Sequence, residues 1–246
     1  MDKLQGRKYS GDLYGRKFGS QDGFEKLGNV SGLKTSTEIE QDVLKSTGAD
    51  DYGQAISVEI KPSETKINLS FNSFNKDGLA RALMGEAVDK AKSKQTVDKQ
   101  SFTLPKAGFL KLEHQDIDPT TFELFDESDQ KQDPDTYKLR AVLGMVELTE
   151  QSALTAGDAV KISYQTKERA GFSIDSNTLP KIELELLLEG KDRISGREGS
   201  LWIPHAVLSS AGDLDWFSDD WWENGMEGTL IKEDSKPTMR FTEYTE

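Results

Sequence analysis

The stretch between residues 56 and 91 constrains the fold most, because the spacing of its apolar residues changes partway along it. Apolar side chains alternate with polar ones over 56–61, and the alternation returns over 67–71 after a break at Pro62 and Ser63. A period of two residues is typical of strands with one buried face. The sequence therefore predicts two half-buried strands in succession.

Beyond these strands the spacing becomes that of a helix. Asn75 is a suitable N-cap, and Asp77 places a carboxylate in the first turn, where the helix dipole favours it. We expect a helix over residues 75–90, packed against a sheet, with Leu83 largely buried at the centre of its apolar face. The residues expected on that face are Leu79, Leu83, Met84 and Ala87.

Short strands account for most of the remaining chain. They are predicted at 12–17, 25–34, 101–104, 109–113, 122–125, 139–148, 160–164, 182–188, 200–208, 227–232 and 238–244, with a bulge at Gly144 inside the strand 139–148. Many short strands with one helix indicate a mainly β fold, an antiparallel β-sandwich or partial barrel with one flanking α-helix. No change of composition marks a boundary, so we expect a single domain over 1–246 with an N-terminal arm at 1–10.

The segment 36–54 lacks a clear period and is rich in carboxylates. Its acidic residues are Glu38, Glu40, Asp42, Asp50 and Asp51, and it also contains Gly48 and Gly53. Structureless segments of this length inside a compact domain are usually functional or mobile. We therefore expect a long surface loop here.

The charge balance and the lack of cysteine exclude several classes of function. Lys and Arg number 31 against 44 Asp and Glu, which gives a formal net charge of −13. Such a chain repels polyanions, so a sequence-reading DNA-binding protein is not expected. There is no Cys, no apolar run long enough to span a membrane and no signal peptide at the start, so we expect synthesis and assembly in a cytosol.

Candidate catalytic or metal-binding patterns are weak. The two histidines, His114 and His205, have no second imidazole or cysteine at metal-ligand spacing, and no phosphate-binding glycine loop is present. The segment 213–224 begins like a calcium loop, but Ser218 occupies the glycine position and Asn224 the position of the bidentate Glu. We expect no enzyme activity, cofactor or metal.

A cluster of aromatic residues among acids has two interpretations. Trp216, Phe217, Trp221 and Trp222 lie close together in the sequence. They could pack in the core, or they could form a contact between subunits, where large amphipathic rings are favoured. The sequence leaves both interpretations open.

The order of these segments resembles that of a known family. The opening strand GDLYGRKFGS, the strand LGNVSGL, the Lys-Pro-containing strand, the helix pattern Leu-Ala-x-x-Leu-x-Gly-Glu and the closing strands LWIPHAVLSSAGDLDWF and WENGMEGTLI carry the likeness. Together they resemble the major tail tube proteins of long-tailed, non-contractile bacteriophages (siphoviruses). No single piece is a strict signature, and the resemblance covers most of the chain.

The resemblance implies a structural virion protein of the phage tail, assembled in the host cytoplasm. Copies would close into a barrel as hexameric rings, with the helix at the subunit boundary, and the rings would stack into a hollow tube through the segment 36–54 and the terminal arms. It also implies that carboxylates face the lumen, with Glu183 and Glu185 as candidates, and that genomic DNA passes through without specific binding. The implied partners are other copies of the chain, a tape-measure protein, a tail terminator and tail-tip proteins.

Three other functions remain as alternatives. A secretion-system tube protein would form similar rings. A glycoside hydrolase of sandwich fold or a carbohydrate-binding virion module would instead act on or bind glycans. Rings or tubes of purified protein would favour a tail tube or secretion-system tube protein over the two glycan-related alternatives.

Overall fold

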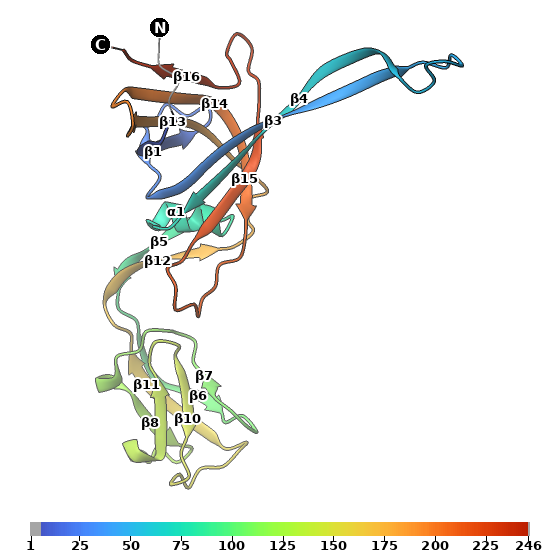
Figure 1. The fold of residues 1–246 in the computed structure, drawn as a ribbon. Coiled ribbons are helices and arrows are strands. Elements are labelled where there is room, and N and C mark those ends of the chain that lie inside the picture. Colours follow the sequence, from blue (N-terminus) through green and yellow to red (C-terminus); the bar gives the residue numbers. More distant parts are fainter. Residues whose placement is uncertain (1–5, 246) are drawn as a thin grey trace. The chain divides into compact units, whose positions relative to one another are not determined.

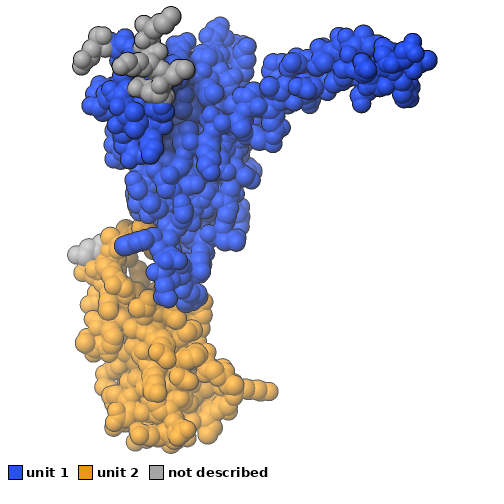
Figure 2. All heavy atoms as spheres, viewed as in Figure 1, with its two compact units in different colours: residues 1–88, 174–246 blue, residues 89–173 orange. Residues whose placement is uncertain are grey.

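The computed structural model describes residues 6–245 and is mainly β, with antiparallel sheets and one α-helix. The described residues do not form a closed barrel. The chain divides into two compact units, coloured separately in Figure 2. Unit 1 contains the chain up to Val88 and from Ile174 onward, and unit 2 is Asp89–Ser173. Of the expected N-terminal arm, residues 1–5 lie outside the described part, and Tyr9 and Ser10 already belong to the first strand.

Unit 1 is built on one large antiparallel sheet (Figure 1). In sheet order its strands are β2 (Glu25–Lys26), β1 (Tyr9–Lys17), β13 (Ile182–Asp192), β14 (Glu198–Ala211), β15 (Asn224–Leu230), β4 (Ala55–Phe71) and β3 (Val30–Lys45), and β16 (Arg240–Glu243) pairs with β14 beside β15. The C-terminal strands β13, β14 and β15 lie between two pairs of N-terminal strands, since β1 pairs with β13 and β4 pairs with β15. The sheet therefore forms only when distant parts of the chain meet.

The core of unit 1 covers one face of this sheet. The alternating residues Ile182, Leu184 and Leu186 of β13 are buried there, together with Ile67 and Leu69 of β4. Side chains from β1 and from β15 belong to the same cluster. The alternation predicted for 67–71 is confirmed, and the strand predicted at 182–188 is present as β13 and alternates in the same way over its first residues.

The predicted helix is correct at its start and wrong at its end. α1 spans Lys76–Ala82, and the Asn75 side chain accepts a hydrogen bond from the Gly78 amide at 2.6 Å, as expected of an N-cap. The helix then ends in a Schellman motif: Met84 has a left-handed φ of 52°, its amide donates to Arg81, and the Gly85 amide donates to Ala80. The remaining residues of the predicted helix enter β5 (Glu86–Ser93).

Gly85, just past the end of the helix, is in close contact with the backbone of Asp175. A Cβ at this position would lie 2.2 Å from the Asp175 carbonyl oxygen, so only glycine fits. The predicted apolar face is therefore only partly correct. Met84 is buried in the core of unit 1, Leu79 and Leu83 are half-buried, and Ala87 is half-buried in a strand.

Unit 2 consists of two small sheets around its own core. One sheet has the order β6 (Thr96–Thr103), β11 (Ala159–Gln165), β8 (Glu123–Asp126), and the other has the order β7 (Leu110–Lys111), β10 (Met145–Leu148), β9 (Tyr137–Arg140). Two short 3₁₀ helices, Pro119–Thr121 and Pro134–Thr136, lie between these strands in the sequence. Ile162 and Tyr164 of β11 and Val146 of β10 are buried in one cluster, so the two sheets share an interior.

The predicted strand 139–148 is instead two strands joined by a turn. β9 and β10 pair antiparallel, with Met145 opposite Arg140, and Gly144 closes the turn with a positive φ of 62°. A Cβ on Gly144 would lie 2.0 Å from the His114 carbonyl oxygen. The glycine therefore marks a reversal of the chain and not a bulge.

The chain enters unit 2 through β5 and leaves it through β12 (Arg169–Asp175), and these two strands pair with each other. A single domain was expected, whereas the structure has two units with separate cores. The composition does not change at the boundary because both units use the same alternation of apolar and polar residues.

Candidate assembly surfaces

The segment 36–54 is a strand-rich hairpin and not a loop. Most of it belongs to β3, and only residues 46–54 form a turn before β4 begins. β4 pairs with β15 no further than Thr65, so beyond that point β3 and β4 pair only with each other among the described strands. We call residues 38–62 the distal hairpin, which extends past the sheet in Figure 1.

One face of the distal hairpin is apolar and uncovered. Residues opposite each other in an antiparallel pair share a face, and Val43 is opposite Val58 while Ile60 is opposite Gln41. Ile39 lies on this face too, opposite Pro62. The exposed fractions of Ile39, Val58 and Ile60 are 59%, 49% and 59%. We call the side chains of Ile39, Val43, Val58 and Ile60 the apolar face of the hairpin.

The opposite face of the hairpin is acidic. Glu40 is opposite Lys61, and Asp42 is opposite Glu59. Leu44 also lies on this face, opposite Ser57. Of the carboxylates expected in a loop, Glu40 and Asp42 therefore belong to a strand and are exposed on it.

Two further acidic residues of this segment, Glu38 and Asp51, have structural partners. Glu38 forms an ion pair with Lys66 at 2.6 Å near the base of the hairpin. At the tip, Asp51 accepts a hydrogen bond from the Ser46 hydroxyl at 2.7 Å, and Asp50 lies in the same turn. The tip is thus an ordered turn.

The other face of the main sheet is polar, and both lumen candidates lie on it. Glu185 accepts hydrogen bonds from Arg16 Nε at 2.9 Å and from Trp202 Nε1 at 2.8 Å. Glu183 contacts Lys181 Nζ at 3.0 Å and His205, and the hydrogen bond from Lys181 lowers the pKa of Glu183. The negative charge of both candidates is partly balanced by neighbouring cations.

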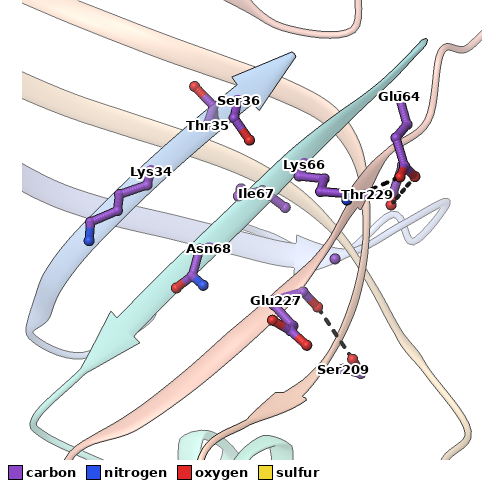
Figure 3. A pocket seen from close by; sticks show the side chains of 11 residues that line it. Lys34, Thr35, Ser36, Glu64, Lys66, Ile67, Asn68, Ser209, Glu227 and Thr229 are labelled. Carbon is purple, nitrogen blue, oxygen red and sulfur yellow. Dashed lines mark hydrogen bonds and ion pairs between the residues drawn. The ribbon is translucent and has the colours of Figure 1, made fainter. Parts of the chain in front are cut away.

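A shallow groove of about 760 Å³ crosses this polar face at the base of the hairpin (Figure 3). Lys34, Lys66 and Glu227 line it. Glu64 receives contacts from Lys66 at 3.3 Å and from the Thr229 hydroxyl at 3.3 Å. Because cations and carboxylates are interleaved here, the groove has no strong preference for a ligand of either sign.

His205 joins three segments of unit 1. Its ring stacks on Phe18 at a centroid distance of 3.6 Å, Nδ1 lies 2.7 Å from Glu233 Oε1, and Nε2 lies 3.3 Å from Glu183 Oε1. These contacts link β14 to the residue that follows β1, to β13 and to the segment after β15. Among the described residues, no group of three or more His, Cys, Asp or Glu side chains is placed to hold a metal ion.

The other histidine has a structural role in unit 2. His114 Nδ1 lies 3.0 Å from the hydroxyl of Tyr164, and burial raises the pKa of that phenol. This pair fixes the buried end of a core side chain.

The aromatic cluster lies in the irregular segment between β14 and β15. We call residues 212–223 the aromatic loop. Trp216 and Trp222 meet edge to face at 5.1 Å, whereas Phe217 is 97% and Trp221 91% exposed. Phe217 and Trp221 are therefore not packed in the core. A contact between subunits remains a prediction.

Comparison with known proteins identifies the family. Residues 4–244 match the family described as protein of unknown function UCP028589. The chain belongs to this family. No curated protein matches the sequence. Over residues 6–245, no helix is long and apolar enough to cross a membrane. The α-helix in this part of the chain, α1, has seven residues.

Several contacts in this family member join residues that are far apart in the sequence and could not be predicted from it. The Arg16 side chain and Glu185 are 169 residues apart, and His205 is 22 and 28 residues from its two carboxylates. The β4 side of the hairpin's apolar face could be predicted from the sequence, because apolar and polar residues alternate over 56–60. Its partner strand was missed because Glu38, Glu40 and Asp42 concealed the alternating Ile39 and Val43.

Proposed function

We propose that this protein is a self-assembling structural subunit of a hollow tube, in the manner of a siphovirus tail tube protein. The observation that carries the proposal is the uncovered apolar face of the distal hairpin. A soluble protein rarely exposes a contiguous apolar surface unless another molecule covers it. A second copy of the chain is the partner that self-assembly supplies.

The energetics of the hairpin support this reading. A two-stranded ribbon is at best marginally stable in water, because it has no second layer to bury its apolar side. Fully burying one Val or Ile side chain contributes about 1.5–3 kcal/mol. Covering Ile39, Val43, Val58 and Ile60 in an interface would therefore stabilise both the hairpin and the assembly.

The open edges of the main sheet support ring formation. β3 is the last strand at one end of the sheet order, and at the other end β2 pairs with β1 only at Tyr14 and Gly15. Exposed edges are templates for pairing with another chain. We propose that edges of neighbouring copies join, so that a ring of sheets closes into the barrel that one copy lacks, with six copies in the ring and α1 near the subunit boundary.

The polar face of the sheet would then line the lumen. Glu183 and Glu185 would face the channel, and the pairing of Arg16 with Glu185 leaves no excess of cations there to hold a phosphate backbone. Genomic DNA would pass without specific binding. In this proposal the tube belongs to a virion tail assembled in the host cytoplasm, with a tape-measure protein, a terminator and tail-tip proteins as further partners and with no enzymatic role.

A pair of adjacent substitutions tests the proposal. Val43→Asp puts a charge on the apolar face of the hairpin, and Leu44→Asp puts the same charge on the opposite face. Negative-stain microscopy and sedimentation velocity should find rings or tubes for the unmodified protein and for Leu44→Asp, and no rings or tubes for Val43→Asp, whose melting temperature should be unchanged. A monomeric unmodified protein at all concentrations, or normal tubes from Val43→Asp, would overturn the proposal.

A further inference from the structure

Two exposed surfaces of opposite charge lie at the two ends of β14. The aromatic loop follows the last residue of β14, Ala211, while the turn between β13 and β14 precedes its first residue, Glu198. β14 has 14 residues, which corresponds to about 45 Å at about 3.3 Å per residue. The two surfaces therefore cannot contact each other within one copy.

The aromatic loop combines exposed rings with negative charge. Residues 212–223 contain five carboxylates and no Lys or Arg. Trp216 is 58% exposed, and Phe217 and Trp221 are almost fully exposed. The Asp215 carboxylate accepts a hydrogen bond from the Phe217 amide at 3.0 Å, and the Ser31 hydroxyl donates to Glu223 at 2.8 Å, so the loop is tied both to itself and to β3.

The opposite end combines exposed apolar side chains with positive charge. We define the terminal patch as residues 6–8, 191–198 and 240–245, which hold six Lys or Arg against three Asp or Glu in a chain of net charge −13. One of the three carboxylates, Asp192, is fully buried. Ile194 and Tyr244 of the patch are 55% and 61% exposed.

Hydrogen bonds hold the three segments of the terminal patch together. The Arg193 amide donates to the Lys8 carbonyl at 2.8 Å, and the Tyr244 amide donates to the Glu198 carbonyl at 2.9 Å. Glu243 contacts Tyr9 at 2.8 Å and Arg197 at 3.2 Å. The patch is thus a built surface that joins both ends of the chain to the β13–β14 turn.

We infer that the aromatic loop of one copy docks on the terminal patch of the next copy. Both surfaces offer uncovered apolar area, and their charges are complementary, which favours association and fixes its direction. The distal hairpin of a neighbouring copy fits the aromatic loop less well than the terminal patch does, because one face of the hairpin is acidic like the loop. A contact between two different surfaces of the same chain repeats without closing on itself and produces a linear assembly.

This inference rests on the proposed self-assembly and names the contact along the tube axis. It assigns to the aromatic residues a role that the hairpin does not fill. The lack of cysteine in the chain makes the contact directly testable, because an introduced thiol is the only thiol present.

The test mixes two single-cysteine proteins. Phe217→Cys and Ile194→Cys are prepared separately, mixed and treated with a short bismaleimide, and covalent dimers are counted on a denaturing gel. We expect dimers in the mixture and few with either protein alone. Phe217→Cys mixed with Ala107→Cys, an exposed site in unit 2, is the matched control and should give only background.

The outcomes separate this inference from the proposed function. Tubes without the Phe217–Ile194 dimer would overturn the inference and leave the tube proposal standing. The dimer without tubes would support the docking contact and count against the tube. A charge test adds a second arm: Asp219→Lys with Asp220→Lys should abolish the dimer, and Lys8→Glu with Arg193→Glu on the other copy should restore it. Dimers that are indifferent to both changes would also overturn the inference.

Discussion

The two halves of β4 have the same pattern and opposite environments. In the half next to the core, Ile67 and Leu69 are 1% and 0% exposed, whereas in the distal half Ile56 and Val58 are 63% and 49% exposed. Both halves alternate apolar and polar residues, and both pair with β3. Only the core half also pairs with β15 and packs against the rest of unit 1.

The comparison shows that an alternating pattern does not reveal what will cover the apolar face of the strand. Alternation shows that one face of a strand is suited to burial, but it does not say which molecule buries it. In the core half the partner is the chain itself. In the distal half the described chain supplies no partner, and the proposed self-assembly would supply one.

The largest expected effect tests the core half of β4. Leu69→Asp places a charge in the core of unit 1, where a cavity and an unpaired ion together should cost more than about 5 kcal/mol, comparable with the whole stability of a domain. We expect insoluble or unfolded protein by circular dichroism. Asn68→Asp, one residue away on the polar face, is the control and should fold normally. A soluble Leu69→Asp protein with a normal melting temperature would show that the core half is no better covered than the distal half.

A smaller effect concerns the buried carboxylate that ties the terminal patch together. Asp192 accepts hydrogen bonds from the amides of Lys8 and Ile194 and from the Ser195 hydroxyl, and the first of these contributes most to lowering its pKa to about 2. A lowered pKa stabilises the folded state above the unfolded value near 3.8, and this contribution is lost as the pH falls toward 2. Asp192→Asn should lower the melting temperature at pH 7 and weaken its dependence on pH between about 4 and 2.

Thermal unfolding followed at several pH values measures this effect. The comparison is between the unmodified protein and the variant, since other carboxylates titrate in both. Parallel curves over the whole range would mean that the buried Asp192 contributes no more than an exposed carboxylate of the distal hairpin.

The smallest effect on stability is expected from removing the distal hairpin. Replacing residues 40–61 by Asn-Gly, a favoured two-residue turn, shortens β3 and β4 to the part next to the core. We expect the melting temperature of the monomer to change by no more than about 3 °C, roughly 1 kcal/mol for a chain of this size, while assembly is lost. Substantial loss of stability in the monomer would show that the hairpin is covered within its own chain.

Local signals in the sequence predicted the elements that depend on neighbouring residues. Asn75 caps α1 because its side chain needs only the amide three residues later. The alternation in β13 and β11 identified buried faces for the same reason. Gly85 is a local signal for the end of a helix, whereas the apolar spacing of Ala87 and Val88 favours a longer one, and the structure ends the helix before Gly85.

The candidate surfaces were predictable to a lesser extent. The exposure of Trp221 and Phe217 followed from neither composition nor spacing, because a tryptophan in a core and one in a loop have the same flanking acids. The terminal patch joins residues near both ends of the chain through contacts such as that between Lys8 and Arg193. No local pattern reports contacts over such separations.

The sequence by itself determined the class of the fold, the strand faces suited to burial, the cap of the helix and the acidic character of the chain, because each depends on residues a few positions apart. Only the tertiary structure decided that the chain forms two units, that residues 38–62 are a hairpin with an uncovered apolar face, and that the lumen candidates are paired with cations. These features depend on which distant segments meet. Burial is a property of the whole packed molecule, so a residue's own neighbours in sequence cannot fix it.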